Sequence, residues 1–215
     1  MNCKFFPQAQ IIKVSSDVEL TAFNCSDIVV QLAKIAPNAV FPLHKHPESQ
    51  IGMLFSGQLE MNINGTKTMI EPLQQVYIAQ PNILHGSLNP FSEIALGFDV
   101  KRIIKDQFQS KLENGIFQLT TNQYKNTNFS CQSLAGSWFE VLVTQIQQGE
   151  KIPIHSSEKE QIGIIINGEL TMTVDNQKQS LKYGTIYYVP PHLPYSGYNS
   201  SDELVSLIEI SINKD

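Results

Sequence analysis

The sequence has little of what marks disulfide-rich, nucleic-acid-binding or membrane proteins. Its three cysteines lie far apart and show no CxxC spacing, which is typical of ordinary thiols in a reducing compartment. Charged residues make up 16% of the chain, the formal net charge is -5, and no run of Lys and Arg stands out. No apolar run reaches the roughly 20 residues of a membrane span, and the N-terminus lacks the basic patch and apolar core of a signal peptide. We therefore expect a cytoplasmic protein that binds neither nucleic acid nor membrane.

Helical periodicity is also scarce. The best helix candidate covers residues 101–112, and the polar, Asn-rich stretch 120–133 is expected to be part of a connection between two domains. A chain of 215 residues, 41% of them hydrophobic, is long enough to form one large domain or two small ones, each with a buried core.

An internal repeat decides between these two choices. The segments "HKHPESQIGMLFSGQLEM" (44–61) and "HSSEKEQIGIIINGELTM" (155–172) share a Gln-Ile-Gly tripeptide and several later apolar positions. The segments "VYIAQPNILHGSLN" (76–89) and "IYYVPPHLPYSGYN" (186–199) align with nearly the same offset. Matching at an almost constant offset over this length indicates two copies of one fold.

Within each copy the periodicity is that of β-strands. The segment 59–70 alternates apolar and polar residues and turns at an Asn-Gly pair, and the segment 170–181 repeats the pattern. Prolines and glycines separate short strands, as in small antiparallel barrels and jelly rolls. The sequence therefore predicts an all-β chain with two barrels, at residues 1–108 and 109–215.

Four side chains of the first half have the spacing of a metal site. His44 and His46 are two residues apart, so on a strand both point to the same face, and Gln50 keeps the same parity. His85 comes from a separate strand. Three imidazoles and one amide oxygen that converge in a barrel mouth can hold a divalent metal and leave positions for solvent or substrate.

This spacing, His-x-His-x3-Gln-x6-Gly followed by His85-x3-Asn89, resembles the two motifs of the cupin superfamily, which usually carry Glu in the place of Gln50. The second half fits the same frame from Gly149 to Asn199. The chain therefore resembles a bicupin over nearly its whole length, which implies a tandem of two jelly-roll barrels. Cupins often associate through strand edges, so the resemblance also allows a homodimer.

A narrower resemblance rests on "QIGMLFSGQLEM", "YIAQPNILHG", "FDVKR" and "EQIGIIINGELTMTV". These segments are similar to the bicupin isomerases of bacilysin and aeruginosin biosynthesis, and the compact chain favours the aeruginosin type. The resemblance implies an isomerase in an antibiotic or other secondary-metabolite pathway. Its substrate would be a 2-oxo acid, dihydro-4-hydroxyphenylpyruvate, the decarboxylation product of prephenate. The reaction would be a 1,3-allylic shift of a ring double bond into conjugation with the oxo acid.

For the site, the resemblance implies one divalent transition metal in the first barrel, held by His44, His46, Gln50 and His85. Iron, cobalt, nickel, manganese or zinc could each serve, because the metal polarises the oxo acid without redox change. Gln50 can alternatively hydrogen-bond to a water on the metal.

The second barrel departs from the family pattern at two ligand positions. Ser157 and Tyr195 stand where the second and third histidines belong, which leaves His155 and Gln161. We expect this barrel to hold no metal, and we interpret His155 and His192 as polar residues of the barrel mouth. The first barrel departs instead in three framework residues, where the family has Gly, Gly and Pro (Asn38, Gln74 and Gln80).

Two further residues are candidates for catalysis. Arg102, at the end of "FDVKR", can clamp a substrate carboxylate, although such an arginine is often a solvated strand end. Tyr77 can supply a phenol near the pocket, although buried tyrosines are common in β-barrels. The general base stays open between Tyr77 and a water on the metal. Met53, Leu54 and Phe55 are either core or the apolar wall for a six-membered ring.

Two other functions fit the same residues. A cupin dioxygenase acting on a small aromatic or 2-oxo acid would have the same three-histidine site, and it would consume O2. A bicupin that binds a small molecule without turnover would explain the half-lost second site.

Overall fold

The computed structural model describes residues 4–103, 113–124 and 130–213, and every regular element in these ranges is a β-strand. None of these residues belongs to a helix long and apolar enough to cross a membrane. The expected helix at 101–112 is not seen where it can be checked, because its first two residues end strand β10. The remainder, from 104 to 112, lies outside the described residues.

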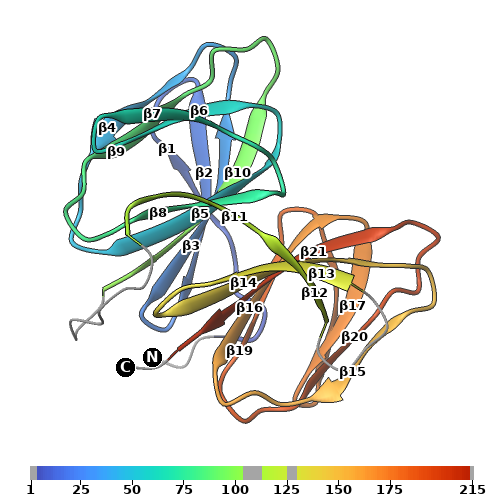
Figure 1. Cartoon of the computed structure of the whole chain (residues 1–215). Helices are drawn as coiled ribbons and strands as arrows, with labels where there is room; N and C mark the ends of the chain where they lie inside the picture. Colours follow the sequence, from blue (N-terminus) through green and yellow to red (C-terminus); the bar gives the residue numbers. More distant parts are fainter. Residues whose placement is uncertain (1–3, 104–112, 125–129, 214–215) are drawn as a thin grey trace. The chain divides into compact units, whose positions relative to one another are not determined.

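The chain forms two compact units, which confirms the tandem arrangement (Figure 1). The division differs from the expected 1–108 and 109–215: one unit is Gln8–Leu119, and the other is Thr120–Asp215 with the N-terminal segment through Pro7. The first unit extends beyond residue 108 because strand β11 (Gly115–Gln118) pairs with β8 (Gln75–Ala79). The N-terminal segment belongs to the second unit because Phe5 accepts a hydrogen bond from the Tyr188 amide and packs against that unit's core.

The first unit, drawn in blue to green in Figure 1, contains two antiparallel sheets. The larger has the order β1-β2-β3-β10-β5-β8-β11, and the smaller has the order β4-β9-β6-β7. Besides β8 and β11, its strands are β1 (Gln10–Lys13), β2 (Val18–Cys25), β3 (Ile28–Ile35), β4 (Val40–His44), β5 (Ser49–Ser56), β6 (Leu59–Ile63), β7 (Thr66–Ile70), β9 (His85–Leu88) and β10 (Ala95–Arg102).

The second unit, drawn in yellow to red, repeats this architecture with the orders β12-β13-β14-β21-β16-β19 and β15-β20-β17-β18. Its strands are β12 (Thr120–Gln123), β13 (Ser130–Ala135), β14 (Phe139–Ile146), β15 (Lys151–His155), β16 (Glu160–Asn167), β17 (Glu169–Val174), β18 (Gln177–Lys182), β19 (Ile186–Val189), β20 (Tyr195–Tyr198) and β21 (Val205–Ile212). Apart from β11, each strand of the first unit has a counterpart at the same place in the second. The two halves are thus two jelly-roll barrels, as the repeat predicts.

The polar stretch 120–133, expected as a connection, instead contains β12 and the start of β13. All four residues of β12 are exposed, because β12 is an edge strand, so its sequence carries no apolar signal.

Local sequence explains the strands that build the first barrel. In β6, Leu59, Met61 and Ile63 are buried and alternate with half-buried neighbours, so one face of the strand packs into the core. The hairpin from β6 to β7 turns at Asn64 and Gly65, which both have positive φ, as a tight two-residue hairpin turn requires.

One framework departure has a simple explanation. Asn38 has a φ of 60°, and its counterpart Gly149 has a φ of 77°. Asparagine is one of the few residues other than glycine that adopt this left-handed conformation at low cost, so the turn before β4 keeps its shape.

Candidate metal centre and active site

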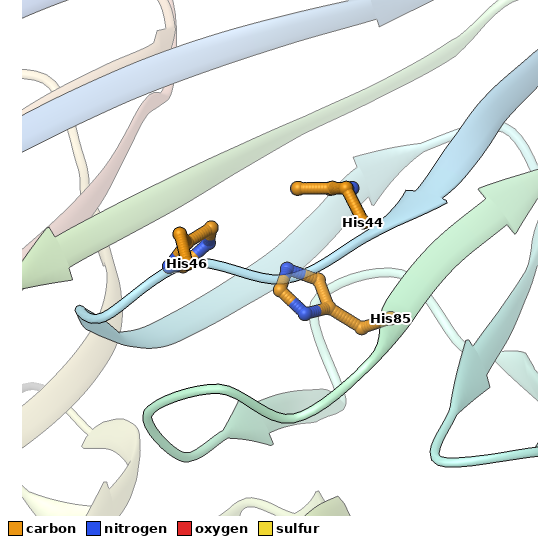
Figure 2. A group of neighbouring side chains, drawn as sticks. All are labelled: His44, His46 and His85. Carbon is orange, nitrogen blue, oxygen red and sulfur yellow. The ribbon is translucent and has the colours of Figure 1, made fainter.

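Three histidines of the first barrel converge, as their spacing predicts. His44 ends β4, His46 lies in the loop that follows, and His85 begins β9 (Figure 2). His44 and His85 are paired across β4 and β9, next to a shift in register that lies between Phe41 and His44. One potential ligand atom from each of the three rings lies within 4.8 Å of the other two. Within the described residues, this is the group of His, Cys, Asp and Glu side chains with the geometry of a metal site.

Backbone carbonyls set the orientation of all three rings. The Nδ1 atoms of His44 and His85 lie 2.9 and 2.8 Å from the carbonyl oxygens of Pro42 and Ile83. The Nδ1 atom of His46 lies 3.2 Å from a carbonyl oxygen in the following loop. A neutral imidazole has one N–H, and a carbonyl can only accept, so each Nδ1 carries the hydrogen. Each Nε2 therefore presents a lone pair, which is the state a metal ligand needs.

The side-chain oxygen of Gln50 completes the group. Its Oε1 lies 2.8 Å from Nε2 of His46 and 3.2 Å from Nε2 of His85. With neutral rings, these are acceptor atoms that face one another, an arrangement that is unfavourable without a positive charge between them. A divalent cation resolves this conflict, so the donor set fits a metal.

Burial favours the neutral form of two of the rings, His44 and His85. The pKa of His85 is lowered from 6.5 to about 4, mainly by burial and to a smaller extent by the nearby His44, His46 and Lys101. Burial also lowers the pKa of His44. At neutral pH these two imidazoles carry no proton that a metal would have to displace.

Behind the histidines, a row of residues crosses three neighbouring strands of the large sheet. Gly52 on β5 lies opposite Tyr77 on β8 and also opposite Asp99 on β10. A Cβ atom at Gly52 would lie 2.5 Å from the Tyr77 ring, so the missing side chain lets that ring cross the strand. The Tyr77 hydroxyl donates a hydrogen bond to Asp99 and accepts one of 2.7 Å from Nε2 of Gln50.

Burial shifts the pKa values of the two acidic groups in this row, Tyr77 and Asp99. It raises the pKa of Tyr77 well above 10, and the neighbouring Asp99 carboxylate raises it further. Burial also raises the pKa of Asp99, against the charge of Lys101 and the hydrogen bonds from Tyr77 and Gln50. The phenol is therefore protonated at neutral pH.

A cavity opens beside the candidate ligands. Three of the ligands (His44, Gln50 and His85) line it together with Tyr77, Asp99 and Lys101, and most of its remaining wall is apolar (Ala33, Ile35, Phe41, Met53, Leu54, Leu59, Met61, Ile70 and Phe98). Together with its open mouth it encloses about 550 Å³ of space. Met53 and Leu54 are thus both core residues and pocket wall. Phe55, which follows them, is not one of the residues that line this cavity.

Arg102 does not reach this cavity. The residues of β10 that line the cavity are Gly97, Phe98, Asp99 and Lys101, and Arg102 is not among them. Arg102 is buried, and its Nε donates a 3.1 Å hydrogen bond to Asp27. Lys101 is the basic residue with a long side chain that lines the cavity.

The second barrel holds a different cluster at the equivalent place. His155 and Tyr195 are paired across β15 and β20, with ring centroids 4.2 Å apart, as His44 and His85 are in the first barrel. The Tyr195 hydroxyl donates to Glu209, which also accepts from the Tyr124 hydroxyl, both at 2.7 Å. Among the described residues, no hydrogen-bond partner is within reach of Nε2 of His155.

The second-barrel amide faces the opposite way. Nε2 of Gln161 donates to the Ser157 hydroxyl at 3.1 Å and to the carbonyl oxygens of Lys159 and Glu160 at 3.2 and 3.0 Å. Its Oε1 accepts from Ser211. The amide therefore presents hydrogens, and not a lone pair, toward the place that His46 takes in the first barrel. His192 is exposed in a turn.

Sequence reasoning missed Asp99 and Lys101. Their signal is present in "FDVKR", but it depends on which face of β10 turns inward, and that is decided by pairing with β5. A second signal lies in the Gln-Ile-Gly tripeptide that both halves share. Its glycine, Gly52 or Gly163, lies under a tyrosine ring from the neighbouring strand, so each half pairs this glycine with a later tyrosine.

Comparisons with known proteins agree with the two-barrel fold. The cupin domain profile matches residues 142–211. The crystal structure of AerE from Microcystis aeruginosa is 44% identical in sequence, with a TM-score of 0.93 over 98% of this chain and 99% of AerE. The H2HPP isomerase of Bacillus subtilis is 26% identical over 196 residues, which is 91% of this chain and 83% of that protein. Oxalate decarboxylase from B. subtilis, 12% identical with a TM-score of 0.78 over 96% of this chain and 75% of its own, shares the fold.

Proposed function

This chain belongs to the bicupin isomerase family of AerE and the H2HPP isomerase, and we propose that it is a metal-dependent isomerase of dihydro-4-hydroxyphenylpyruvate. The reaction would be a 1,3-allylic shift that brings a ring double bond into conjugation with the 2-oxo acid, in a secondary-metabolite pathway. One proton leaves the substrate at one end of the allylic system, another returns at the other end, and no oxidant is needed.

One observation carries this proposal: ring nitrogens of three histidines lie within 4.8 Å of one another, and the amide oxygen of Gln50 lies beside two of them, at the side of an apolar cavity. A divalent metal bound there would supply a Lewis acid for the ketone and carboxylate oxygens of a 2-oxo acid. His44, His46, Gln50 and His85 would hold it. Gln50 leaves the site one charge more positive than the usual Glu would, which favours an anionic substrate.

The other residues of the cavity then have defined tasks. Lys101 is the proposed partner of the substrate carboxylate, in the role that the sequence suggested for Arg102. The apolar wall would hold the six-membered ring and exclude water from it. Of the two candidates for the general base, a water on the metal is the one we propose, because the raised pKa keeps the Tyr77 phenol protonated at neutral pH and its hydrogen is donated to Asp99.

We propose a divalent metal from the set iron, cobalt, nickel, manganese and zinc, because imidazole-rich sites accept each of them. A cytoplasmic location and a homodimer formed through strand edges remain predictions from composition and family resemblance.

An ultraviolet assay tests the function. Prephenate is decarboxylated enzymatically, the purified protein is added, and the metal content of the same protein is measured. We expect absorbance of a conjugated dienone to grow faster than the spontaneous rate, and His85→Ala to lose both the metal and this acceleration. Wild-type protein that carries its metal and gives only the spontaneous rate would contradict the proposed reaction.

An oxygen electrode separates the isomerase from a cupin dioxygenase with the same ligands. Isomerisation consumes no O2. Stoichiometric O2 uptake with this substrate would favour the dioxygenase, and binding of the substrate without either signal would favour a non-catalytic bicupin.

A further inference from the structure

We propose that Asp99 is a positioning residue that determines which end of the Gln50 amide faces the three histidines. This inference rests on the metal site of the proposed function, and it does not depend on the reaction that the site performs. Asp99 would contact neither metal nor substrate in this role and would act through Tyr77 and Gln50.

The argument begins with the amide itself. A Gln side chain can bind a metal through its carbonyl oxygen, while its NH2 group offers only hydrogens. The two orientations of Gln50 differ by a half-turn about one bond and occupy nearly the same volume, so packing alone does not select one of them. A hydrogen-bond partner that can only accept, on the side away from the histidines, does select one.

Asp99 makes Tyr77 such a partner. A phenol has a single hydrogen, and Tyr77 donates it to the Asp99 carboxylate. Toward Gln50 the same oxygen can then only accept, and it receives the 2.7 Å hydrogen bond from Nε2. Asp99 also accepts a hydrogen bond from the Gln50 amide. Both interactions hold the NH2 group away from the histidines, so Oε1 points at Nε2 of His46 and His85.

The second barrel shows the outcome when this contact is missing. Tyr187 lies over Gly163 just as Tyr77 lies over Gly52, and Glu209 is paired opposite Gly163 as Asp99 is opposite Gly52. The Tyr187 hydroxyl, however, has no hydrogen-bond partner among the described residues, and the carboxylate of Glu209 accepts from other tyrosines. In this barrel the amide of Gln161 is turned, with its NH2 group toward Ser157.

The experiment measures Co(II) binding to full-length protein stripped of metal. Affinity is obtained by competition with a chromogenic chelator, and the visible absorption of bound Co(II) reports its ligand set. The variants are Asp99→Ala, Asp99→Asn, Tyr77→Phe and, as the matched control in the other barrel, Tyr187→Phe. Thermal unfolding of each metal-free variant shows whether it is folded.

We expect Asp99→Ala and Tyr77→Phe to weaken Co(II) binding about 10- to 100-fold, the usual effect of removing a group that orients a metal ligand. Asp99→Asn should bind Co(II) nearly as tightly as wild type with the same spectrum, because its side-chain oxygen still accepts from Tyr77. Tyr187→Phe removes a hydroxyl that has no hydrogen-bond partner in the described part of the chain, so it should change neither affinity nor spectrum.

A rescue separates orientation from general damage. In Gln50→Glu both side-chain oxygens can bind a metal, so orientation no longer matters, and adding Asp99→Ala to this background should cost little or no affinity. Equal loss in both backgrounds, or Co(II) affinity in Asp99→Ala equal to wild type, would overturn the positioning role and leave the proposed function intact. Wild-type protein that binds no Co(II) would overturn both.

Discussion

Gln50 and Gln161 occupy the same place in two barrels of the same strand order, and their amides face opposite ways. Around Gln50, three histidines present lone pairs toward the amide oxygen. Around Gln161, a serine and a tyrosine replace two of those histidines, and the amide hydrogens are used by a hydroxyl and two backbone carbonyls. The difference teaches that two barrels with the same strand order can carry different side-chain clusters at the same place, one with the geometry of a metal site and one held by hydrogen bonds.

In the second barrel, hydrogen bonds hold the residues at the positions equivalent to the candidate ligands. Tyr195, in the place of His85, directs its hydroxyl to Glu209, and its ring lies against His155. Burying a carboxylate costs free energy unless hydrogen bonds compensate, and two tyrosine hydroxyls supply them. The two barrels can therefore be compared at equivalent positions.

The largest contrast is expected between His44→Ala and His155→Ala. His44 is a proposed ligand, so its loss should abolish stoichiometric metal binding and reduce the isomerisation rate to the spontaneous one. His155 shares its barrel with Gln161, but Ser157 and Tyr195 stand at the positions equivalent to His46 and His85. His155→Ala should therefore retain metal and activity. Metal analysis and the ultraviolet assay on both variants check this, and equal losses would show that the barrels are not functionally distinct.

A second contrast compares two neighbours on β10. Lys101→Met should raise KM with a smaller effect on kcat and lower kcat/KM about 10- to 100-fold, because a charged hydrogen bond to the substrate carboxylate is lost. Arg102→Met should lower the midpoint of thermal unfolding, because it breaks the contact with Asp27, and leave KM unchanged. A raised KM in Arg102→Met instead would place the carboxylate on the other face of the strand.

Gly52→Ala and Gly163→Ala place a Cβ against a tyrosine ring in the first and second barrel respectively. Each should lower the free energy of unfolding by about 1–3 kcal/mol, as is usual when a packed core is overfilled. Gly52→Ala alone should also weaken Co(II) binding, since the Tyr77 hydroxyl would be displaced from Gln50. Urea unfolding measures the change in stability, and metal titration measures the change in affinity. Unchanged metal affinity in Gly52→Ala would argue against the link from Tyr77 to Gln50 and the metal site.

The smallest effect is a pH dependence of the metal-free protein. The pKa of His85 is lowered from 6.5 to about 4 in the folded chain, so between these values the unfolded chain binds more protons. The stability of the first barrel should therefore fall as pH drops from 6.5 toward 5, with a slope of up to about 1.4 kcal/mol per pH unit for this histidine. Hydrogen exchange resolves the barrels: protection of β5 should decrease more than protection of β16. Equal protection of β5 at pH 6.5 and pH 5 would contradict the lowered pKa.

Much of this structure could be predicted because its signals are local. The repeat, the alternation in β6 and the Asn-Gly turn predicted two jelly-roll barrels, and the spacing of His44, His46 and Gln50 predicted that their side chains meet. These features depend on parity along one strand or on short turns, which the sequence shows directly.

The rest depends on pairing between distant strands. Asp99 and Arg102 are three residues apart, and only the register of β10 against β5 places the first in the cavity and the second on the other side. The boundary near residue 119 likewise depends on β11 pairing with β8, and the exposed edge strand β12 has no apolar pattern to reveal it.

The most direct test of the central claim is a titration of metal-stripped protein with one divalent metal, followed by the ultraviolet assay at each step. The account predicts that isomerase activity rises in proportion to bound metal and stops rising at one equivalent per chain, because the three-histidine group found among the described residues lies in the first barrel. Full activity in the stripped protein, or a linear rise that continues to two equivalents, would contradict it.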